Sequence, residues 1–277
     1  MVNNLIIDNI IKSALIEDIN YIDITTDNLI EDNHISKGKF LAKEDGIICG
    51  IEVAKRVFFI LDEKIKFHVL RNDGEFVKKG DIIATVEGST KNILKGERVS
   101  LNIIQRLSGI ATKTNKIVNL VKGYNVKIVD TRKTTPNMRV LEKYAVKIGG
   151  GYNHRYNLSE SIMIKDNHIK ALGSIREAVN KIKYKIGHTV KIEVEVKNLD
   201  ELKEALDLNV DIILLDNMSI DEMKKAVKIN NNKSILEASG NINEENIVDV
   251  AKTGVDIISM GALTHSFKSL DISMKII

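Results

Sequence analysis

The spacing of hydrophobic residues predicts different structures in the two halves of the chain. Residues 5–19, with the sequence LIIDNIIKSALIEDI, place apolar side chains at helical spacing. Residues 38–50 and 64–88 instead alternate apolar with polar positions and contain glycine turns, as strands do. The first part of the chain, to about residue 100, therefore predicts an α+β domain.

A long amphipathic segment follows, from residue 96 to about residue 122. Its apolar residues recur at helical spacing, at Val99, Ile103, Ile104, Leu107, Ile110 and Ile117. The pattern predicts either one long helix or two helices with a break at Gly109. This segment is expected to join the two parts of the chain.

After this segment, strand patterns and helix patterns alternate. The predicted strands are residues 126–130, 149–155, 161–165, 190–196, 211–216, 234–239 and 256–261. The last four recur roughly every 21 to 24 residues and precede helical patterns, which is typical of βα units in a parallel sheet. We therefore predict an α/β fold with a (β/α) barrel. A doubly wound open sheet is the alternative, although it usually has a glycine-rich first turn that is not evident in this chain.

Composition limits where the protein works and what it binds. The 277 residues carry a net charge of only +3, which does not indicate a general surface for nucleic acid. The single cysteine, Cys49, cannot form an intrachain disulfide, and the N-terminus lacks the basic and apolar regions of a secretion signal. No stretch reaches the roughly 20 apolar residues that span a bilayer. We expect a soluble, cytoplasmic protein that binds neither nucleic acid nor membranes.

Polar residues gather at the carboxyl ends of the predicted strands, the edge where barrel enzymes place their active sites. The polar residues are Asp130, Thr131, Arg132 and Lys133; His154 and Arg155; Lys165; Glu195; Asp216; and Ser239 and Asn241. The small or apolar residues beside them are Gly240, Met260, Gly261 and Ala262. The grouped cations indicate a strongly anionic small molecule. The carboxylates suit hydroxyl groups or a magnesium ion, and the small residues near the end of the chain suit a phosphate.

Several of these residues have structural alternatives. Asp216 could cap a helix, and Glu193 is expected to point outward from the strand that presents Glu195. His168 is expected to be structural. The glycines at 149–151 are a weak signal for a phosphate loop, because such runs also serve tight turns and close packing.

Two other functional patterns are set aside. Residues 73–88, DGEFVKKGDIIATVEG, resemble the hairpin of biotinyl and lipoyl carriers, but the residues that flank the modified lysine in carriers are missing. The sequence also lacks the HExxH, CxxC and GxxxxGK[ST] spacings of zinc hydrolases, thioredoxin-like sites and P-loop NTPases.

Nine segments, taken together and in order, resemble the quinolinate phosphoribosyltransferase family. They are residues 17–26, 97–112, 130–136 (DTRKTTP), 141–155 (LEKYAVKIGGGYNHR), 164–168, 193–196, 214–217, 237–241 (EASGN) and 254–266. The resemblance implies an open seven-stranded (β/α) barrel over residues 106–264. It also implies an N-terminal α+β sandwich-like domain over residues 1–105, on which the tail at 265–277 packs.

The resemblance also implies an activity and its participants. The family transfers the phosphoribosyl group of phosphoribosyl pyrophosphate to quinolinate with decarboxylation, as a pentosyltransferase of NAD biosynthesis. The products are nicotinate mononucleotide, pyrophosphate and CO2, and the reaction uses Mg2+. The family forms homodimers, which can assemble further to a hexamer.

By this resemblance each matched residue has an expected role. Thr131, Arg132, His154, Arg155 and Lys165 would line the site for the pyridine dicarboxylate and the sugar phosphate, with Lys133 near the reacting groups. Glu195 and Asp216 would act on the ribose hydroxyls and the metal. Ser239, Gly240 and Asn241, with Met260, Gly261 and Ala262, would cradle the phosphate. Arg98 would reach into the site of the second subunit.

Rival functions and two departures accompany the resemblance. A molybdenum-locus pyrophosphorylase-like protein and nicotinate phosphoribosyltransferases share much of the pattern, but the intact NHR and TRKT segments favour a dicarboxylate. A carrier built on the 73–88 hairpin would leave the strand-end cations unexplained. Asn137 and Asn241 stand where glycine is common in the family. Asparagine tolerates the left-handed backbone that the turn at residue 137 needs, and Asn241 is expected to narrow the phosphate cradle slightly while keeping its backbone donor.

Overall fold

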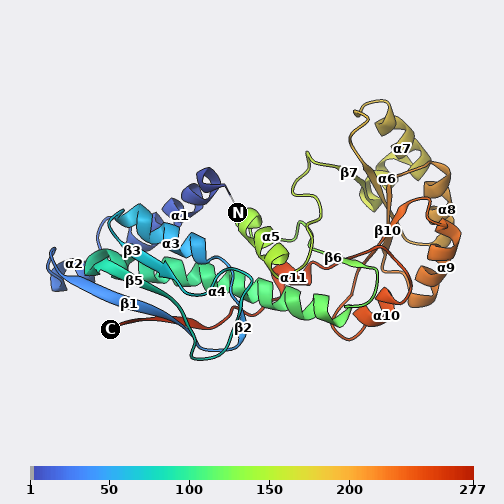
Figure 1. Ribbon diagram of the computed structural model, residues 1–277. Helices are drawn as coiled ribbons and strands as arrows, with labels where there is room; N and C mark the ends of the chain where they lie inside the picture. The colour runs from blue at the N-terminus through green and yellow to red at the C-terminus, as the bar shows by residue number, and fades with distance from the viewer. Residues whose placement is uncertain (1–2) are drawn as a thin grey trace. The chain divides into compact units, whose positions relative to one another are not determined.

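The computed structural model describes residues 3–277, which form two compact units (Figure 1). The first unit comprises the described residues up to Asn115, with Thr134–Gly150 and Leu263–Ile277. The second comprises Lys116–Lys133 and Gly151–Ala262. The expected domain boundaries at residues 105 and 264 stay a prediction, and the segment Thr134–Gly150 groups with the first unit.

The first unit is an α+β structure built around an antiparallel sheet. Its elements are α1 (Asn4–Ile19), α2 (Ile24–Leu29), β1 (Ile35–Ala42), β2 (Gly46–Ile47), α3 (Ile51–Leu61), β3 (Lys66–Val69), β4 (Phe76–Val77), β5 (Ile82–Ser89), most of α4 (Thr90–Leu120), α5 (Arg139–Ile148), α11 (Ala262–His265, except its first residue) and β12 (Ile272–Ile276). The main sheet has the order β12-β1-β5-β3, and β2 pairs with β4. The C-terminal strand β12 thus pairs with β1 from the start of the chain.

The core of this unit lies between its sheet and the helices α3 and α4. Phe40 of β1, Phe58 of α3 and Ile104 of α4 are fully buried in one hydrophobic cluster. The rings of Phe58 and Phe67 stack with centroids 5.7 Å apart. Alternation along β1 and β5 supplies the sheet side of this core, as the sequence predicts.

Of the two expectations for the amphipathic segment, the single long helix is confirmed. Helix α4 runs from Thr90 to Leu120 and passes through Gly109 without a break. A Cβ atom at residue 109 would lie 2.3 Å from the carbonyl oxygen of Lys268. The glycine therefore allows the C-terminal segment to approach the helix closely.

The second unit is a parallel α/β structure. Its elements are β6 (Lys127–Val129), β7 (Ile162–Ile164), α6 (Asp166–Leu172), α7 (Ile175–Lys183), β8 (Ile192–Val196), α8 (Leu199–Asp207), β9 (Ile212–Asp216), α9 (Ile220–Asn230), β10 (Ile235–Ser239), α10 (Ile247–Ala251) and β11 (Ile257–Ser259). The six strands pair in the order β6-β11-β10-β9-β8-β7. Tyr152 forms one further parallel bridge with Val129 of β6, at the position of the predicted seventh strand.

Local sequence explains where the helices of this unit begin. Asn198, before α8, accepts hydrogen bonds from two backbone N–H groups of the first turn. Ser219 and Glu222 form a capping box at the start of α9, and Ser174 caps α7. These caps fix where each helix begins after the loop that follows its strand. Helix α8 then packs beside β8, and α9 beside β10 (Figure 1).

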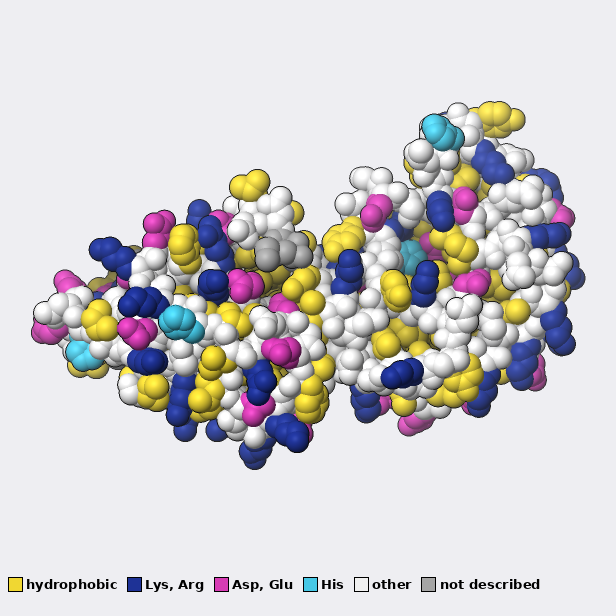
Figure 2. Space-filling model, viewed as in Figure 1, with side chains coloured by type: hydrophobic (Ala, Val, Ile, Leu, Met, Phe, Trp, Pro, Cys, Tyr) yellow, Lys and Arg dark blue, Asp and Glu magenta, His cyan; other side chains and the backbone are white. Residues whose placement is uncertain are grey.

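Two surface properties bear on function: whether a helix could span a membrane, and whether charges of one sign gather on a face. Within residues 3–277, no helix is both long and apolar enough to cross a bilayer. On the face in Figure 2, Lys and Arg side chains of the first unit lie among Asp and Glu. The chemistry suggested by the sequence therefore has to be sought in local clusters.

Candidate functional site

The strand-end residues of the second unit lie at one edge of its sheet. Lys165 directly follows β7, Asp216 and Ser239 end β9 and β10, and Glu195 is the penultimate residue of β8. Because all these strands are parallel, their carboxyl ends share one edge. In the strand register Ser239 pairs with Asp216, and both alternate onto the same face as Glu195.

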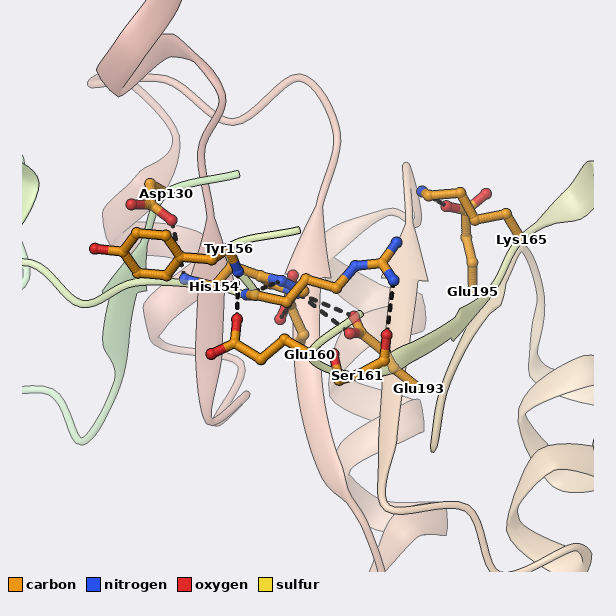
Figure 3. Close-up of polar contacts among 10 residues, drawn as sticks. Asp130, His154, Tyr156, Glu160, Ser161, Lys165, Glu193 and Glu195 are labelled. Carbon is orange, nitrogen blue, oxygen red and sulfur yellow. Dashed lines mark hydrogen bonds and ion pairs between the residues drawn. The ribbon is translucent and has the colours of Figure 1, made fainter. Parts of the chain in front are cut away.

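A buried polar cluster, which we call the floor cluster, consists of His154, Glu193 and Glu237. The Nε2 atom of His154 lies 3.2 Å from Glu193 Oε2 (Figure 3). The same atom lies 3.4 Å from Glu237 Oε2. Both glutamate side chains are only 2 % exposed. A flat sheet would hold the Tyr152 edge and β8 roughly 20 Å or more apart, since neighbouring strands are about 4.8 Å apart. The contacts therefore show that the sheet curves around its interior, as a barrel does.

The protonation of His154 is set by opposing effects. Burial disfavours the charged ring, but hydrogen bonds and charge from Glu193 and Glu237 outweigh it and raise the pKa of His154 to about 10. Against this, the backbone N–H of Arg155 donates to Nδ1 at 2.7 Å, which requires that nitrogen to be unprotonated. The two influences oppose each other, because the buried carboxylates favour a second proton on the ring and the Arg155 contact favours a neutral ring with its proton on Nε2.

Glu193 corrects one sequence expectation. It was expected to point outward, yet it lies in the interior beside His154. Residues two apart in a strand share a face, so Glu193 must face the same way as Glu195. Burial raises the pKa of Glu193, and His154 opposes that shift.

Glu237 is a second interior glutamate, and sequence reasoning did not single it out. Its Oε1 atom has no hydrogen-bond partner among the described residues. The signal that could have identified it is its position two residues before Ser239 on β10, which gives both the same face.

Asp130 anchors the irregular segment that carries His154 and Arg155. Its buried carboxylate accepts the Asn153 side-chain amide at 2.6 Å and the His154 backbone N–H at 2.9 Å. Only Tyr152 in this segment forms a strand bridge. Side-chain hydrogen bonds thus take the place of a regular strand ladder, and they fix the backbone position of His154 and Arg155.

The guanidinium of Arg155 is also fixed at its far end. Its Nη1 donates to the carbonyl of Ser161 at 2.8 Å (Figure 3). Burial, and then the nearby charge of Arg132, lower the pKa of Arg155, with Glu193 opposing. The predicted cations Arg132 and Arg155 therefore lie close enough to repel each other, a repulsion that an anion between them would relieve.

A second ion pair, which we call the rim pair, joins Lys165 and Glu195. Lys165 Nζ lies 2.6 Å from Glu195 Oε2 (Figure 3). The side chains are 44 % and 11 % exposed, respectively, so the pair is far more open than the floor cluster. The sequence predicted a site for each residue but not their direct contact.

Asp216 connects to the end of the next strand through asparagines. Asn217 Nδ2 donates to Asp216 at 2.9 Å, and Asn241 Nδ2 donates to Asn217 at 3.0 Å. Gly240 has φ +95, and a Cβ atom there would lie 2.3 Å from the Asn217 side chain. The glycine is thus required, while Asn241 takes the left-handed conformation at φ 50.

The remaining predicted residues fall into three places. Thr131, Arg132 and Lys133 follow β6, where the backbone N–H of Lys133 donates to Thr131 Oγ1 at 3.0 Å. The backbone N–H of Met260 donates to the carbonyl of Val129 at 3.0 Å and is used in the sheet, and Gly261 and Ala262 follow it directly in the chain. Arg98 is exposed on α4 of the first unit.

The structure also decides several structural alternatives. Asp216 does not cap α9, because Ser219 does. His168 Nδ1 accepts the backbone N–H of Lys165 at 2.9 Å, which is a structural role at the start of α6. Gly149 packs against α4, where a Cβ atom would lie 2.5 Å from the carbonyl oxygen of Ala111. Asn137 takes φ 64, as the turn after Pro136 was expected to need.

The donor chemistry fits the magnesium ion expected from the sequence. Glu195 and Asp216 offer carboxylate oxygens, which Mg2+ prefers, and it commonly binds through one or two carboxylates together with substrate phosphates and water. Among the described residues, the one group of three close ligand atoms is the floor cluster. Three of its four carboxylate oxygens contact the imidazole, and Glu237 Oε1 has no hydrogen-bond partner among the described residues.

Comparison with known proteins covers nearly the whole chain. Residues 23–108 match the model "Quinolinate phosphoribosyl transferase, N-terminal domain", and residues 110–275 match the corresponding C-terminal domain. A Bacillus subtilis protein described as a "probable nicotinate-nucleotide pyrophosphorylase (carboxylating)" is 44 % identical over 99 % of this chain and 94 % of its own length. A Methanocaldococcus jannaschii protein with the same description is 47 % identical, over 97 % and 96 %. The solved nicotinate-nucleotide pyrophosphorylase of Francisella tularensis superposes with a TM-score of 0.95 at 43 % identity, covering 100 % of this chain and 98 % of that one.

Proposed function

The chain belongs to the quinolinate phosphoribosyltransferase family, and from that premise we propose that it converts quinolinate and phosphoribosyl pyrophosphate to nicotinate mononucleotide, pyrophosphate and CO2. The observation that carries this proposal is the meeting of cations and carboxylates at the carboxyl edge of one curved parallel sheet. That arrangement suits two anionic substrates and a reaction that develops positive charge on a sugar.

Quinolinate would bind where the cations gather. Arg132 and Arg155, close enough to affect each other, would take one carboxylate, and His154 and Lys165 would help to hold the ring and the second. Arginine suits this task because its planar fork can bind a carboxylate through two hydrogen bonds. A substrate with two carboxylates uses more of these cations than nicotinate would, so quinolinate is the preferred substrate.

Phosphoribosyl pyrophosphate would occupy the adjoining strand ends. Glu195 and Asp216 would hold the ribose hydroxyls and Mg2+, which supplies positive charge to the pyrophosphate when it is bound. Ser239, Gly240, Asn241, Gly261 and Ala262 would surround the 5′-phosphate. The small residues allow the phosphate a close approach to the backbone.

The chemistry would need no covalent intermediate with the protein. As the bond to pyrophosphate breaks, the ribose gains oxocarbenium character, which a nearby carboxylate such as Glu195 or Asp216 stabilises. Lys133 would neutralise charge near the reacting groups. The ring nitrogen is positive once it is joined to ribose, and this charge stabilises the carbanion left by CO2. The protein would then orient the departing carboxylate and exclude water.

A homodimer would complete this site. Arg98 is exposed on the long helix α4, so its side chain can reach a second copy of the chain. We propose that it contributes one more cation to the partner's anion site, and that dimers can assemble to a hexamer. Arg98→Ala mixed with a variant inactivated at Lys133 tests this, because mixed dimers should regain up to about one wild-type site in each dimer.

A single assay tests the proposed activity. Purified protein with Mg2+ and phosphoribosyl pyrophosphate should form nicotinate mononucleotide and CO2 from quinolinate, as followed by chromatography and CO2 release. Formation of the nucleotide from nicotinate but not from quinolinate would contradict the proposal and favour a nicotinate phosphoribosyltransferase. Lys133→Ala should lose turnover while calorimetry still detects quinolinate, and Lys203→Ala, exposed on α8, serves as the matched control.

A further inference from the structure

The floor cluster places two acidic side chains next to His154, a residue proposed to bind a dicarboxylate. Two carboxylates would repel such a substrate, so contact with the substrate does not explain why they are there. Glu193 comes from β8 and Glu237 from β10, on either side of β9. Both are almost completely buried, and both approach the same nitrogen of His154. Buried carboxylates are costly unless they are paired, so their partner indicates what they do.

These contacts hold the imidazole from two sides. Glu193 places both oxygens near Nε2, at 3.3 Å and 3.2 Å, and Glu237 places Oε2 at 3.4 Å. A ring held by strands on both sides of β9 cannot swing toward either strand without losing a charged contact. The side chain of His154 is only 13 % exposed, which leaves a single edge for other contacts.

The position of His154 is passed on to the next residue. Arg155 follows it directly in an irregular segment whose backbone is held by Asp130 rather than by a regular strand. The Arg155 guanidinium is tied at its far end to the Ser161 carbonyl. Asp130, the two glutamates and Ser161 thus all hold this segment, and the glutamates do so through the Nε2 atom of the imidazole ring.

We infer that Glu193 and Glu237 are positioning residues that hold His154, and with it Arg155, in the orientation that receives a substrate carboxylate. This inference rests on the proposed function for the identity of the substrate. It assigns the two glutamates no contact with substrate.

The test combines steady-state kinetics with a double-mutant cycle. Glu193→Gln and Glu237→Gln keep side-chain volume but remove the charge, and each should raise KM for quinolinate roughly tenfold. The KM for phosphoribosyl pyrophosphate should change much less. In a His154→Gln background the same substitutions should add little, because their effect passes through the imidazole. Glu245→Gln, an exposed glutamate of the same unit, is the matched control.

A second measurement is independent of activity. The imidazole 15N signals of His154 should differ from those of the exposed His188 in wild-type protein and move toward them in Glu193→Gln and Glu237→Gln. If wild-type protein turns over no quinolinate but these signals behave as expected, the proposed function fails while the positioning of His154 stands. Additive kinetic effects in the cycle, or unchanged 15N signals, would overturn the inference.

Discussion

The floor cluster and the rim pair use similar chemistry in different surroundings, and burial separates their roles. Both join a nitrogen base to glutamate on the interior face of one sheet. In the floor cluster both carboxylates are 2 % exposed, whereas Lys165 of the rim pair is 44 % exposed. Water can replace the partner of an exposed charge at little cost but cannot do so in the interior. The floor contacts are therefore part of the framework, and the rim contact can be exchanged for substrate.

The largest effect on stability is expected when the cationic side chain is removed from each cluster in turn. His154→Leu leaves two buried carboxylates without a partner and should cost about 3–5 kcal/mol of stability. Lys165→Met leaves Glu195, whose side chain is 11 % exposed, with partial access to water and should cost less than His154→Leu, about 1–2 kcal/mol. Urea unfolding of both variants measures the two values. Adding Glu193→Gln and Glu237→Gln to His154→Leu should recover most of the loss, and equal losses at the two sites would remove the distinction.

The second test asks whether Lys165 leaves Glu195 when quinolinate binds. In the free protein Lys165 and Glu195 neutralise each other at 2.6 Å, so binding of quinolinate has to draw Lys165 away. Lys165→Met should weaken quinolinate binding by about 10- to 100-fold, the value of a charge-assisted hydrogen bond. Calorimetry measures this change. Glu195→Gln should instead tighten quinolinate binding, because it releases Lys165; weaker binding in that variant would show that the pair is needed intact.

The last test is the dependence of stability on pH. Burial opposes the charge on His154, but Glu193 and Glu237 raise its pKa to about 10, above the value of about 6.5 in an unfolded chain. Its stabilising contribution should be complete below about pH 6.5 and should decline as pH rises toward 10. Urea midpoints between pH 6.5 and 9.5 should therefore fall further in wild-type protein than in His154→Gln. Parallel profiles would mean that the Arg155 contact to Nδ1 keeps the ring neutral.

Periodicity in the sequence was sufficient for the framework of the barrel. Each predicted strand of the second half matches an observed one to within a few residues, with the segment near Tyr152 reduced to one bridge. The strand-end rule also grouped Lys165, Asp216 and Ser239 correctly at one edge. These features depend on the alternation of apolar and polar residues and on strand direction, and residues close together in the sequence determine both.

The contacts across the barrel were not predictable in the same way. The floor cluster depends on how far the sheet curves, which brings the His154 segment opposite β8 and β10. Nothing in the local pattern around His154 specifies that curvature. The error at Glu193 was different, because strict alternation with Glu195 would have placed it inside. The apolar residues Ile192, Val194 and Val196 take the other face of the strand and are also buried.

The pairing of β12 with β1 has a consequence for how the protein is made. Lys39 lies opposite Lys275, so the first sheet joins the start of the chain to its last residues. The whole second unit is encoded between them. On the ribosome, β1 emerges early and keeps one edge unpaired until β12 has been synthesised, whereas strands β7 to β11 emerge close to their neighbours. The N-terminal unit should therefore be the last to complete its fold, and a chaperone that covers the open edge of β1 would act during that interval.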